Sequence, residues 1–345
     1  MSDKNTGTEA HCAGVIHMTK KDFYYPSADG RTKIHAIRWE PEGDPVAIVQ
    51  IIHGMIEFID RYDEFATYLA DHGFLVTGED HLGHGESVIS DKYHGYFGEK
   101  GNEWVIADIH HLRQMMQEEF PDKKYLMLGH SMGSFLVRQY ITEQDVEYAK
   151  GLSGVVVMGT GWTPNAVSGI AKTLAKLLGT DKVGKTAETI DKMAFGAYLK
   201  KIDNPRTVSD WLTKDTEIVD QYRANPWNTF HFTPNAYYHM FAGMQKAHDI
   251  NRMKKLPAGL PLLFTSGAED PVGNWGEGVR KAFMVYTENT ECKVDIRLYD
   301  NDRHEILNET DRANVFADLL AFFEHCLGEY QETFGVVPMD SVYES

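Results

Sequence analysis

Residues 125–133 read Tyr-Leu-Met-Leu-Gly-His-Ser-Met-Gly, an apolar run that ends in the pattern G-x-S-x-G around Ser131. The run Tyr125–Leu128 is typical of a buried strand, and the apolar residues that recur after Gly133 are typical of a helix. Between the two, the pattern predicts a sharp turn that exposes the serine hydroxyl, while glycines on either side let neighbouring backbone pass close to it. A serine held in this way is suited to attack a carbonyl carbon. The same spacing also occurs in ordinary glycine-rich turns, so the other groups of a site have to be found elsewhere in the chain.

Composition bounds the kind of protein that this chain can form. It has 345 residues, 42% of them hydrophobic, which is enough for one large α/β domain with an insertion or for two small domains. The three cysteines, Cys12, Cys292 and Cys326, are odd in number and far apart, which argues against a disulfide framework and favours a reducing compartment. No C-x-x-C or H-x-x-x-H pair occurs, so we expect no zinc site. We also expect no cofactor.

The net charge and the N-terminal segment limit which binding partners and which cellular location we expect. The formal net charge is −17, which disfavours nucleic-acid binding through a broad basic face and strong attraction to an anionic membrane. The first residues lack the apolar run of an export signal, and no stretch of about 18 apolar residues could span a membrane. We therefore expect a cytoplasmic location.

Apolar segments alternate with amphipathic ones along the chain. The runs VAIVQIIH (46–53) and GVVVMG (154–159) are nearly continuous in apolar residues, as strands buried on both faces are. The first two candidate strands are less apolar and are separated by Asp29-Gly30, a hairpin signal, so they are expected at an antiparallel edge. Amphipathic helices are expected at residues 62–72, 103–120 and 313–327. The predicted strands are Asp22–Tyr25, Ile34–Trp39, Ala47–Ile52, Phe74–Gly78, Tyr125–Leu128, Val155–Met158, Leu262–Thr265 and Val294–Tyr299.

This alternation predicts an α/β fold with a mostly parallel, eight-stranded sheet covered by helices on both faces. The rhythm breaks between about Gly161 and Asn251, a stretch with several tryptophans and prolines but no good strand. We interpret residues 161–251, called the cap segment below, as a helical insertion over the carboxyl edge of the sheet, where ligands bind in open α/β sheets. The core then comprises residues 1–160 and 252–330, and residues 331–345 are expected to form a polar tail.

A nucleophilic serine needs a base and an acid that orients the base. Asp270 comes just after the predicted strand Leu262–Thr265, and His304 comes just after the predicted strand Val294–Tyr299. Because the carboxyl ends of parallel strands share one edge of a sheet, we expect Ser131, Asp270 and His304 to meet there.

Three other residues compete for these roles. Glu269 is the closest competitor of Asp270 as the acid. Asp302 could contact His304, but only two residues away it is expected to point elsewhere. His53 precedes the serine and belongs to a turn, so it is a poor candidate for the base.

An oxyanion hole needs two backbone N–H groups that point at one place. One is expected from Met132, the residue after the nucleophile, and the other from the loop after the third strand. That loop begins at His53-Gly54, so the N–H of Met55 is the natural second donor.

A further turn, Asp80 to Ser87, contains two histidines and two glycines. Its glycines do not match G-x-G-x-x-G, and a metal at His81 and His84 would need further ligands. We therefore favour a structural interpretation, a tight loop packed beside the floor of the site, over a metal or phosphate site.

Several of these segments together resemble a known group. They are HGMIEFIDRY (53–62), EDHLGHGES (79–87), GHSMG (129–133), GAEDPV (267–272) and the histidine after the eighth strand. Over residues 22–327 the chain resembles the monoacylglycerol lipase and lysophospholipase branch of the α/β-hydrolase superfamily. The first two segments are much more specific to this branch than G-x-S-x-G, which marks only the superfamily.

The resemblance implies an α/β-hydrolase fold and a set of site residues. It assigns the nucleophile to Ser131, its partners to Asp270 and His304, and the oxyanion donors to Met55 and Met132. Two further residues, Glu57 and Arg61, match the Glu and Arg that the family has near its pocket. The chain departs from the family at Met55, Ile56 and Phe58, where the family often has small residues and a histidine.

The predicted activity is hydrolysis of carboxylic esters of single-chain lipids, monoacylglycerols or lysophospholipids, through an acyl-enzyme intermediate. A peptidase of the prolyl aminopeptidase type and a small-molecule carboxylesterase are the alternatives. Epoxide hydrolases and haloalkane dehalogenases use an aspartate nucleophile, and a non-enzymatic binding module would usually have lost a triad member.

Two features of the cap segment bear on the substrate. Residues 161–180 contain no acidic residue, and apolar side chains recur there at helical spacing, so this helix covers the pocket or rests transiently on a lipid aggregate, through residues such as Leu174 and Leu178. An aromatic cluster further along is expected to form the core of the cap, with some rings also lining the acyl pocket. Its members are Trp227, Phe230, Phe232, Tyr237, Tyr238 and Phe241.

Overall fold

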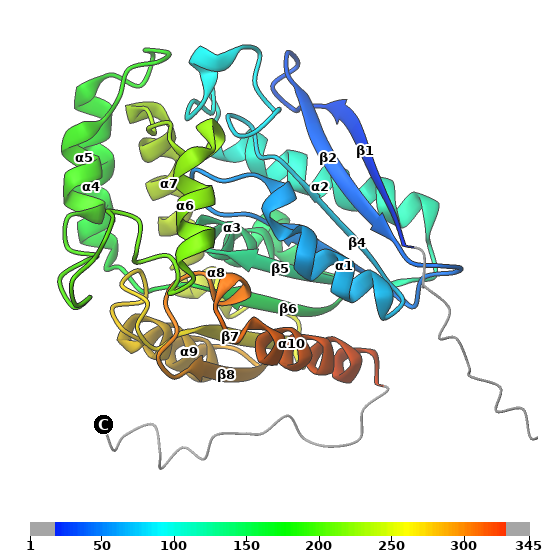
Figure 1. The fold of residues 1–345 in the computed structure, drawn as a ribbon. Helices are drawn as coiled ribbons and strands as arrows, with labels where there is room; N and C mark the ends of the chain where they lie inside the picture. The colour runs from blue at the N-terminus through cyan, green and yellow to red at the C-terminus, as the bar shows by residue number, and fades with distance from the viewer. Residues whose placement is uncertain (1–17, 329–345) are drawn as a thin grey trace, which may run out of the picture.

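The computed structural model describes residues 18–328, so Cys12 and the tail expected at residues 331–345 lie outside the described part. Within it, eight strands form one sheet in the order β1-β2-β4-β3-β5-β6-β7-β8 (Figure 1). The strand β2 pairs antiparallel with both β1 and β4, and all other neighbours pair in parallel. The strands are β1 Thr19–Pro26, β2 Lys33–Glu40, β3 Ala47–Ile52, β4 Phe74–Glu79, β5 Lys124–His130, β6 Leu152–Met158, β7 Pro261–Gly267 and β8 Lys293–Tyr299.

The predicted fold class is therefore confirmed, including the antiparallel edge at the first two strands. The side chains of the central strands alternate between two hydrophobic clusters, one on each face of the sheet. In β3, for example, Ile48 and Ile52 join one cluster, whereas Val49 and Ile51 join the other. This two-sided burial explains why the central strands are almost continuously apolar in sequence.

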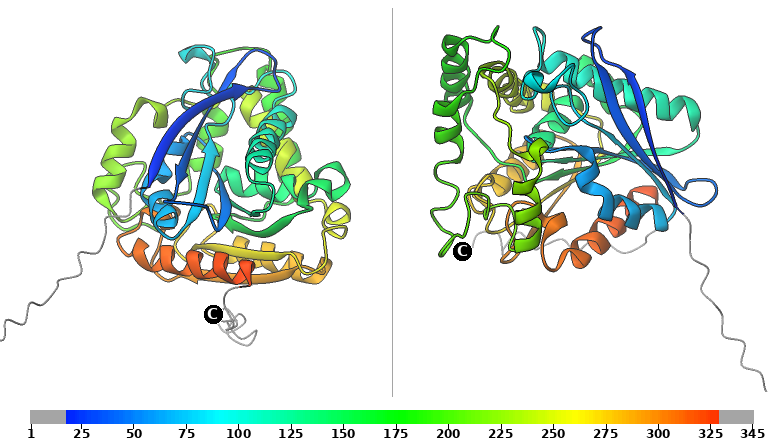
Figure 2. Two further views of the ribbon diagram at one scale, coloured as in Figure 1. Left: turned by 90° about the vertical axis from the view of Figure 1, so that its right-hand side faces the viewer. Right: turned by 45° about the horizontal axis from the view of Figure 1, so that its top comes forward.

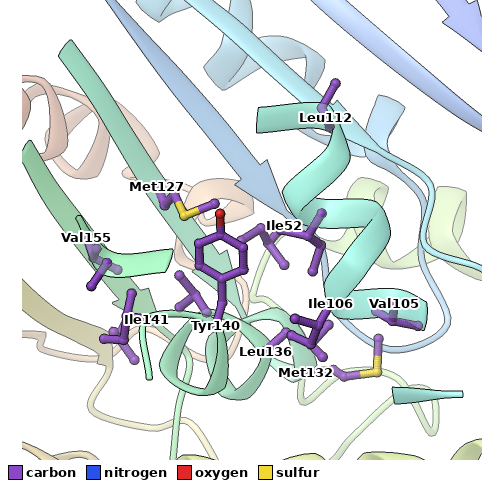
Figure 3. Close-up of a cluster of buried hydrophobic side chains, with 14 of the residues drawn as sticks. Ile52, Val105, Ile106, Leu112, Met127, Met132, Leu136, Tyr140, Ile141 and Val155 are labelled. Atoms are coloured by element: carbon purple, nitrogen blue, oxygen red, sulfur yellow. The ribbon is translucent and has the colours of Figure 1, made fainter. Parts of the chain in front are cut away.

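Helices cover each face. The helices α1 (Asp63–Asp71) and α10 (Arg312–Leu327) pack on one face, and α2 (Asn102–Glu119), α3 (Met132–Tyr140) and α9 (Glu277–Asn289) pack on the other (Figures 1 and 2). Figure 3 shows the second arrangement at close range, where Tyr140 and Leu136 of α3 lie among side chains of α2 and the strands. The predicted helices correspond to α1, α2 and α10, each within a residue of its observed ends.

Between β6 and β7 the described chain is helical and contains no strand. Its helices stand together beside the sheet, and α4 packs along α7 (Figure 1). The limits 161–251 of the cap segment stay a prediction. The helices of this segment are α4 Asn165–Leu178, α5 Glu188–Phe195, α6 Thr216–Ala224, α7 Pro234–Ala247 and α8 Ile250–Met253, with a 3-10 turn η4 at Pro226–Asn228.

Short 3-10 turns also flank the core elements. They are η1 Ile59–Tyr62, η2 Asp91–Tyr93, η3 Glu143–Ala149 and η5 Ile306–Asn308.

None of the helices between residues 18 and 328 combines the length and the hydropathy that crossing a bilayer requires. The cytoplasmic location stays a prediction.

Candidate active site

Ser131 stands at the sharp turn between β5 and α3. Its backbone has φ 55° and ψ −119°, a left-handed conformation that L residues rarely adopt. The flanking glycines allow this turn: a Cβ on Gly133 would lie 1.9 Å from the carbonyl oxygen of Ile52, and a Cβ on Gly129 would lie 2.3 Å from that of Gly133. The turn predicted from the G-x-S-x-G pattern is thus present, with backbone contacts that only glycine permits.

Asp270 and His304 lie on the loops that follow β7 and β8. The Nδ1 atom of His304 is 3.0 Å from Oδ2 of Asp270, and both side chains are buried. Asp270 also accepts hydrogen bonds from the Ser266 hydroxyl and the Val272 N–H, each at 2.8 Å. Burial alone would raise the pKa of Asp270, but the charge and hydrogen bond of His304, with these two donors, outweigh burial and lower it. Asp270 is therefore poised to stay ionised beside the imidazole.

The competing residues lie elsewhere. Glu269 is exposed, and the carboxylate of Asp302 accepts a hydrogen bond from Lys214 Nζ at 3.1 Å. The buried ring of His53 accepts the His81 N–H at Nε2 and so carries its proton on Nδ1, which donates to the Gly54 carbonyl at 2.8 Å. Of the three acids considered, Asp270 is therefore the one that contacts the ring of His304. His53 instead stabilises a turn through its two ring nitrogens.

A cavity of about 350 Å³ connects the turn at Ser131 with the loop that carries His304. Ser131 and His304 both line it, with Met55 and Met132, the two expected oxyanion donors. Within residues 18–328, neither the Met55 N–H nor the Met132 N–H donates a hydrogen bond to a protein acceptor. Met132 is the first residue of α3, where backbone N–H groups have no partner inside the helix.

The loop that carries Met55 is fixed on both sides of that residue. On one side the Gly54 N–H donates to the Glu57 carboxylate, and the Gly54 carbonyl accepts from His53. On the other side the carbonyl of Ile56 accepts from Tyr222 and Asn228, two residues of the cap segment. Residues 53–57, called the oxyanion loop below, are therefore held by both the core and the cap segment.

A buried ionic cluster lies beneath this loop. Arg61 binds Glu305 through two hydrogen bonds of 2.7 Å and Glu57 through one of 2.9 Å. Glu57 also accepts from the Tyr62 hydroxyl at 3.0 Å and from His130 Nδ1 at 3.3 Å. Burial would raise the pKa of Glu57, but the hydrogen bond and charge of His130 and the charge of Arg61 hold it well below its ordinary value.

The cluster ties together the segments that carry the site. His130 precedes Ser131 and also donates to the His304 carbonyl at 3.3 Å, while Glu305 follows His304. Glu57 and Arg61, expected near the substrate, do line the cavity, but their polar atoms are largely engaged with each other and with Glu305. Sequence reasoning missed the roles of Glu305 and His130, although each stands directly beside a predicted site residue.

The turn from Asp80 to Ser87 packs behind the oxyanion loop. The Asp80 carboxylate accepts the N–H groups of Ile59 and Glu86 at 2.8 and 2.9 Å, and the His81 ring stacks on His53 with centroids 3.9 Å apart. Across the described residues no group of three or more His, Cys, Asp or Glu side chains is placed to bind a metal ion. These contacts favour the structural interpretation of the turn.

The rest of the cavity wall is mostly apolar and comes largely from the cap segment. Of the predicted aromatic cluster, Tyr237 and Phe241 line the cavity, whereas the fully buried Phe232 packs against His84 and Phe97 outside the cap segment. The other apolar wall residues from this segment include Val167, Ala171, Leu174, Ile190, Met193, Phe195, Trp211 and Met240.

Comparison with known proteins decides the family. The family described as "Serine aminopeptidase, S33" matches residues 43–311. The chain belongs to this family. It is 26% identical over 309 residues to a monoacylglycerol lipase from Mycolicibacterium smegmatis, and the match covers 89% of this chain and 98% of that relative.

Solved structures agree. A thermostable carboxyl esterase from Bacillus coagulans, solved in complex with glycerol, is 30% identical with a TM-score of 0.81, covering 90% of this chain and all of the esterase. A soluble variant of monoglyceride lipase from Saccharomyces cerevisiae, 17% identical, shares the fold with a TM-score of 0.70, and the match covers 93% and 99% of the two chains. The protein is an α/β-hydrolase of the monoacylglycerol lipase branch and a carboxylic ester hydrolase, as the sequence motifs indicated.

Proposed function

We propose that this hydrolase cleaves esters of single-chain lipids, monoacylglycerols foremost, through a covalent acyl-enzyme formed on Ser131. The observation that carries the proposal is the Asp270–His304 pair, 3.0 Å apart, with His304 lining the same cavity as the serine. The apolar wall of that cavity suits a hydrocarbon chain. The monoacylglycerol lipase relative and the glycerol-bound esterase support the substrate class.

Each group has a role in two steps. His304 removes the proton of Ser131 as the hydroxyl oxygen attacks the acyl carbon, and Asp270 keeps the imidazole in the tautomer that can accept it. The N–H groups of Met55 and Met132 stabilise the negative oxygen of the tetrahedral intermediate. His304 then gives its proton to the departing alcohol. In the second step it takes a proton from water, which attacks the acyl-enzyme and releases the fatty acid.

The charges around the cavity favour a glycerol over a phosphate head group. Arg61 is the only Lys or Arg among the described residues that line the cavity, and both of its terminal nitrogens are bound to Glu57 or Glu305. The charge of Arg61 is already balanced by these two carboxylates, so a phosphate would gain little from it, whereas neutral hydroxyls need no cation. Lysophospholipids are therefore expected to be poorer substrates.

The same pairing argues against an aminopeptidase. Such an enzyme needs a carboxylate that is available to bind the free amine of its substrate. Glu57 and Glu305 are the only acids among the described lining residues, and Arg61 engages both. We therefore expect amide substrates to be cleaved slowly if at all.

A substrate panel tests this proposal. We expect the purified protein to show a higher kcat/KM on monoacylglycerols with long chains than on lysophospholipids of the same chain length, on short p-nitrophenyl esters or on proline amides. The Ser131→Ala variant, assayed in parallel, measures the background. A preference for proline amides, or activity confined to short esters, would contradict the proposed substrate class.

The outer face of α4 is proposed as the surface that meets a lipid aggregate. Three of its apolar side chains, Val167, Ile170 and Leu177, are 53%, 70% and 80% exposed. Leu174 and Leu178, the residues named for this contact from the sequence, are half-buried and pack on the core, Leu174 as part of the cavity wall, so Ile170 and Leu177 are better placed for it. Val167 also lines the cavity, so the exposed face continues into it and a lipid could pass from one to the other.

Charging this face should separate aggregated from dissolved substrates. We expect Ile170→Glu with Leu177→Glu to lower the rate on micellar monoacylglycerol at least tenfold, because apolar area and charge set binding to a lipid surface. The rate on a soluble short ester should change less than twofold. Val208→Glu, at an equally exposed position elsewhere in the cap segment, is the control. Equal losses on both substrates would contradict a lipid-contacting role.

A further inference from the structure

The oxyanion loop contains a backbone conformation that needs support. Ile56 has φ 57°, in the left-handed region, where a β-branched residue is a genuine outlier. Such a conformation is unfavourable by itself and persists only where surrounding contacts enforce it. Two of these contacts are made to the carbonyl of Ile56. It accepts a hydrogen bond from the Tyr222 hydroxyl at 3.2 Å and another from the Asn228 side-chain amide at 3.0 Å.

Both donors come from the cap segment, whereas Ile56 belongs to the core. Tyr222 lies on α6 and Asn228 ends η4, more than 160 residues along the chain from the loop. On the other side of Met55, Gly54 is bound by Glu57 and His53, which are core residues. The Met55 N–H therefore lies between one anchor that stays with the sheet and one that depends on the cap segment.

The two donors are themselves held in place. The ring of Tyr222 lies against the Arg61 guanidinium, 4.8 Å from ring centroid to carbon, and Asn228 is 5% exposed. Next to Asn228, the ring of Trp227 packs edge-on against Phe58 at 5.1 Å. This packing holds both donors in place, so the two hydrogen bonds to the Ile56 carbonyl connect the cap segment firmly to the oxyanion loop.

We propose that Tyr222 and Asn228 are positioning residues for catalysis, which hold the oxyanion loop in the conformation that directs the Met55 N–H into the cavity. This inference rests on the proposed function, since it assigns the Met55 N–H to the oxyanion. It implies that α6 and η4 must be docked on the core before the oxyanion hole is complete. Movement of this part of the cap segment would then withdraw a catalytic donor as well as open the cavity.

The test removes each donor with little change of shape. Tyr222→Phe keeps the ring on Arg61 and loses one oxygen, and Asn228→Leu keeps the approximate size of the side chain. We expect each variant to lower kcat by about threefold to tenfold, less than the loss of a whole oxyanion donor, and the double variant by about 10²-fold, the lower end of the range for such a loss. KM should change less than threefold, because the lost interaction acts in the transition state.

A second readout reports on the oxyanion hole itself. An alkyl boronic acid forms a tetrahedral adduct with a nucleophilic serine and places an anionic oxygen where the intermediate has one. Its affinity should fall by the same factor as kcat in each variant. The matched control is Tyr25→Phe on β1, which also removes a buried tyrosine hydroxyl bound to a backbone carbonyl, that of Asp108 at 3.0 Å, far from the site. It should leave kcat and boronate affinity within twofold of the original.

The outcomes separate the two proposals. If Ser131→Ala keeps its activity, the proposed function fails. If Ser131→Ala is inactive but Tyr222→Phe and the double variant keep kcat and boronate affinity within twofold, the positioning role is wrong and the proposed function stands. Losses that appear only in KM would also contradict the positioning role. Should the double variant not fold, the boronate affinity of Tyr222→Phe alone decides.

Discussion

Replacing Ser131 by alanine is expected to lower kcat on a monoacylglycerol by a factor of about 10⁴ or more. The substitution removes the atom that forms the acyl-enzyme in the proposed mechanism. It also leaves the backbone free to keep the turn, because alanine has a side chain no larger than that of serine. The rate is measured as release of fatty acid under saturating substrate, and folding is checked by thermal unfolding.

His304→Ala is expected to lower kcat by a similar factor, and the effects of the two substitutions should not add. In the proposed mechanism the imidazole takes the serine proton as the hydroxyl oxygen attacks, so the two residues act as one unit. The double variant Ser131→Ala/His304→Ala is therefore expected to be about as active as either single variant. A fluorophosphonate probe should label Ser131 in the original chain, with the site identified by mass spectrometry. Retention of more than a tenth of the activity in Ser131→Ala would overturn the mechanism.

Asp270→Asn should lower kcat by about 10⁴ while leaving the fold intact. The shape of the side chain is kept, and its remaining oxygen can still accept the Val272 N–H, 2.8 Å from Oδ1 of the aspartate. The amide nitrogen, however, would face His304 Nδ1 and donate to it. The imidazole would then carry its proton on Nε2, the atom that has to receive the serine proton, and could no longer act as a base.

The neighbouring acid gives a matched control. Glu269→Gln changes an exposed carboxylate one residue away, and we expect kcat to stay within twofold. Thermal unfolding of both variants should show whether the loss in Asp270→Asn exceeds any effect on stability. If Asp270→Asn and Glu269→Gln were equally active, the acid of the site would have to be sought elsewhere.

Much of the core could be predicted because local patterns are sufficient there. The eight strands are marked by short apolar runs, and the turn at Ser131 is marked by two glycines that backbone contacts require. Asp270 and His304 could be singled out because both follow predicted strands, and parallel strands end at one edge of the sheet. The structure adds the direct contact between these two side chains.

The cap segment was harder because amphipathic spacing identifies an apolar face but not its orientation. In α4 the apolar residues lie on one face of the helix, but their spacing does not say which of them a neighbouring helix covers. Packing along α7 turns Leu174 inward and leaves Ile170 and Leu177 exposed. Which residues of α4 are buried therefore depends on a helix about 70 residues away in the chain. The periodicity within α4 contains no information about that helix.

By itself, the amino-acid sequence determined the alternating sheet architecture, the sharp turn at Ser131 and the placement of Asp270 and His304 just after predicted strands, because these follow from spacing within a few residues. Only the tertiary structure decided which carboxylate meets the imidazole, how Arg61 binds two buried acids, and that Tyr222 and Asn228 hold the carbonyl of Ile56. Those contacts join residues far apart in the chain, and their geometry is set by how the cap segment and the loops pack on the sheet.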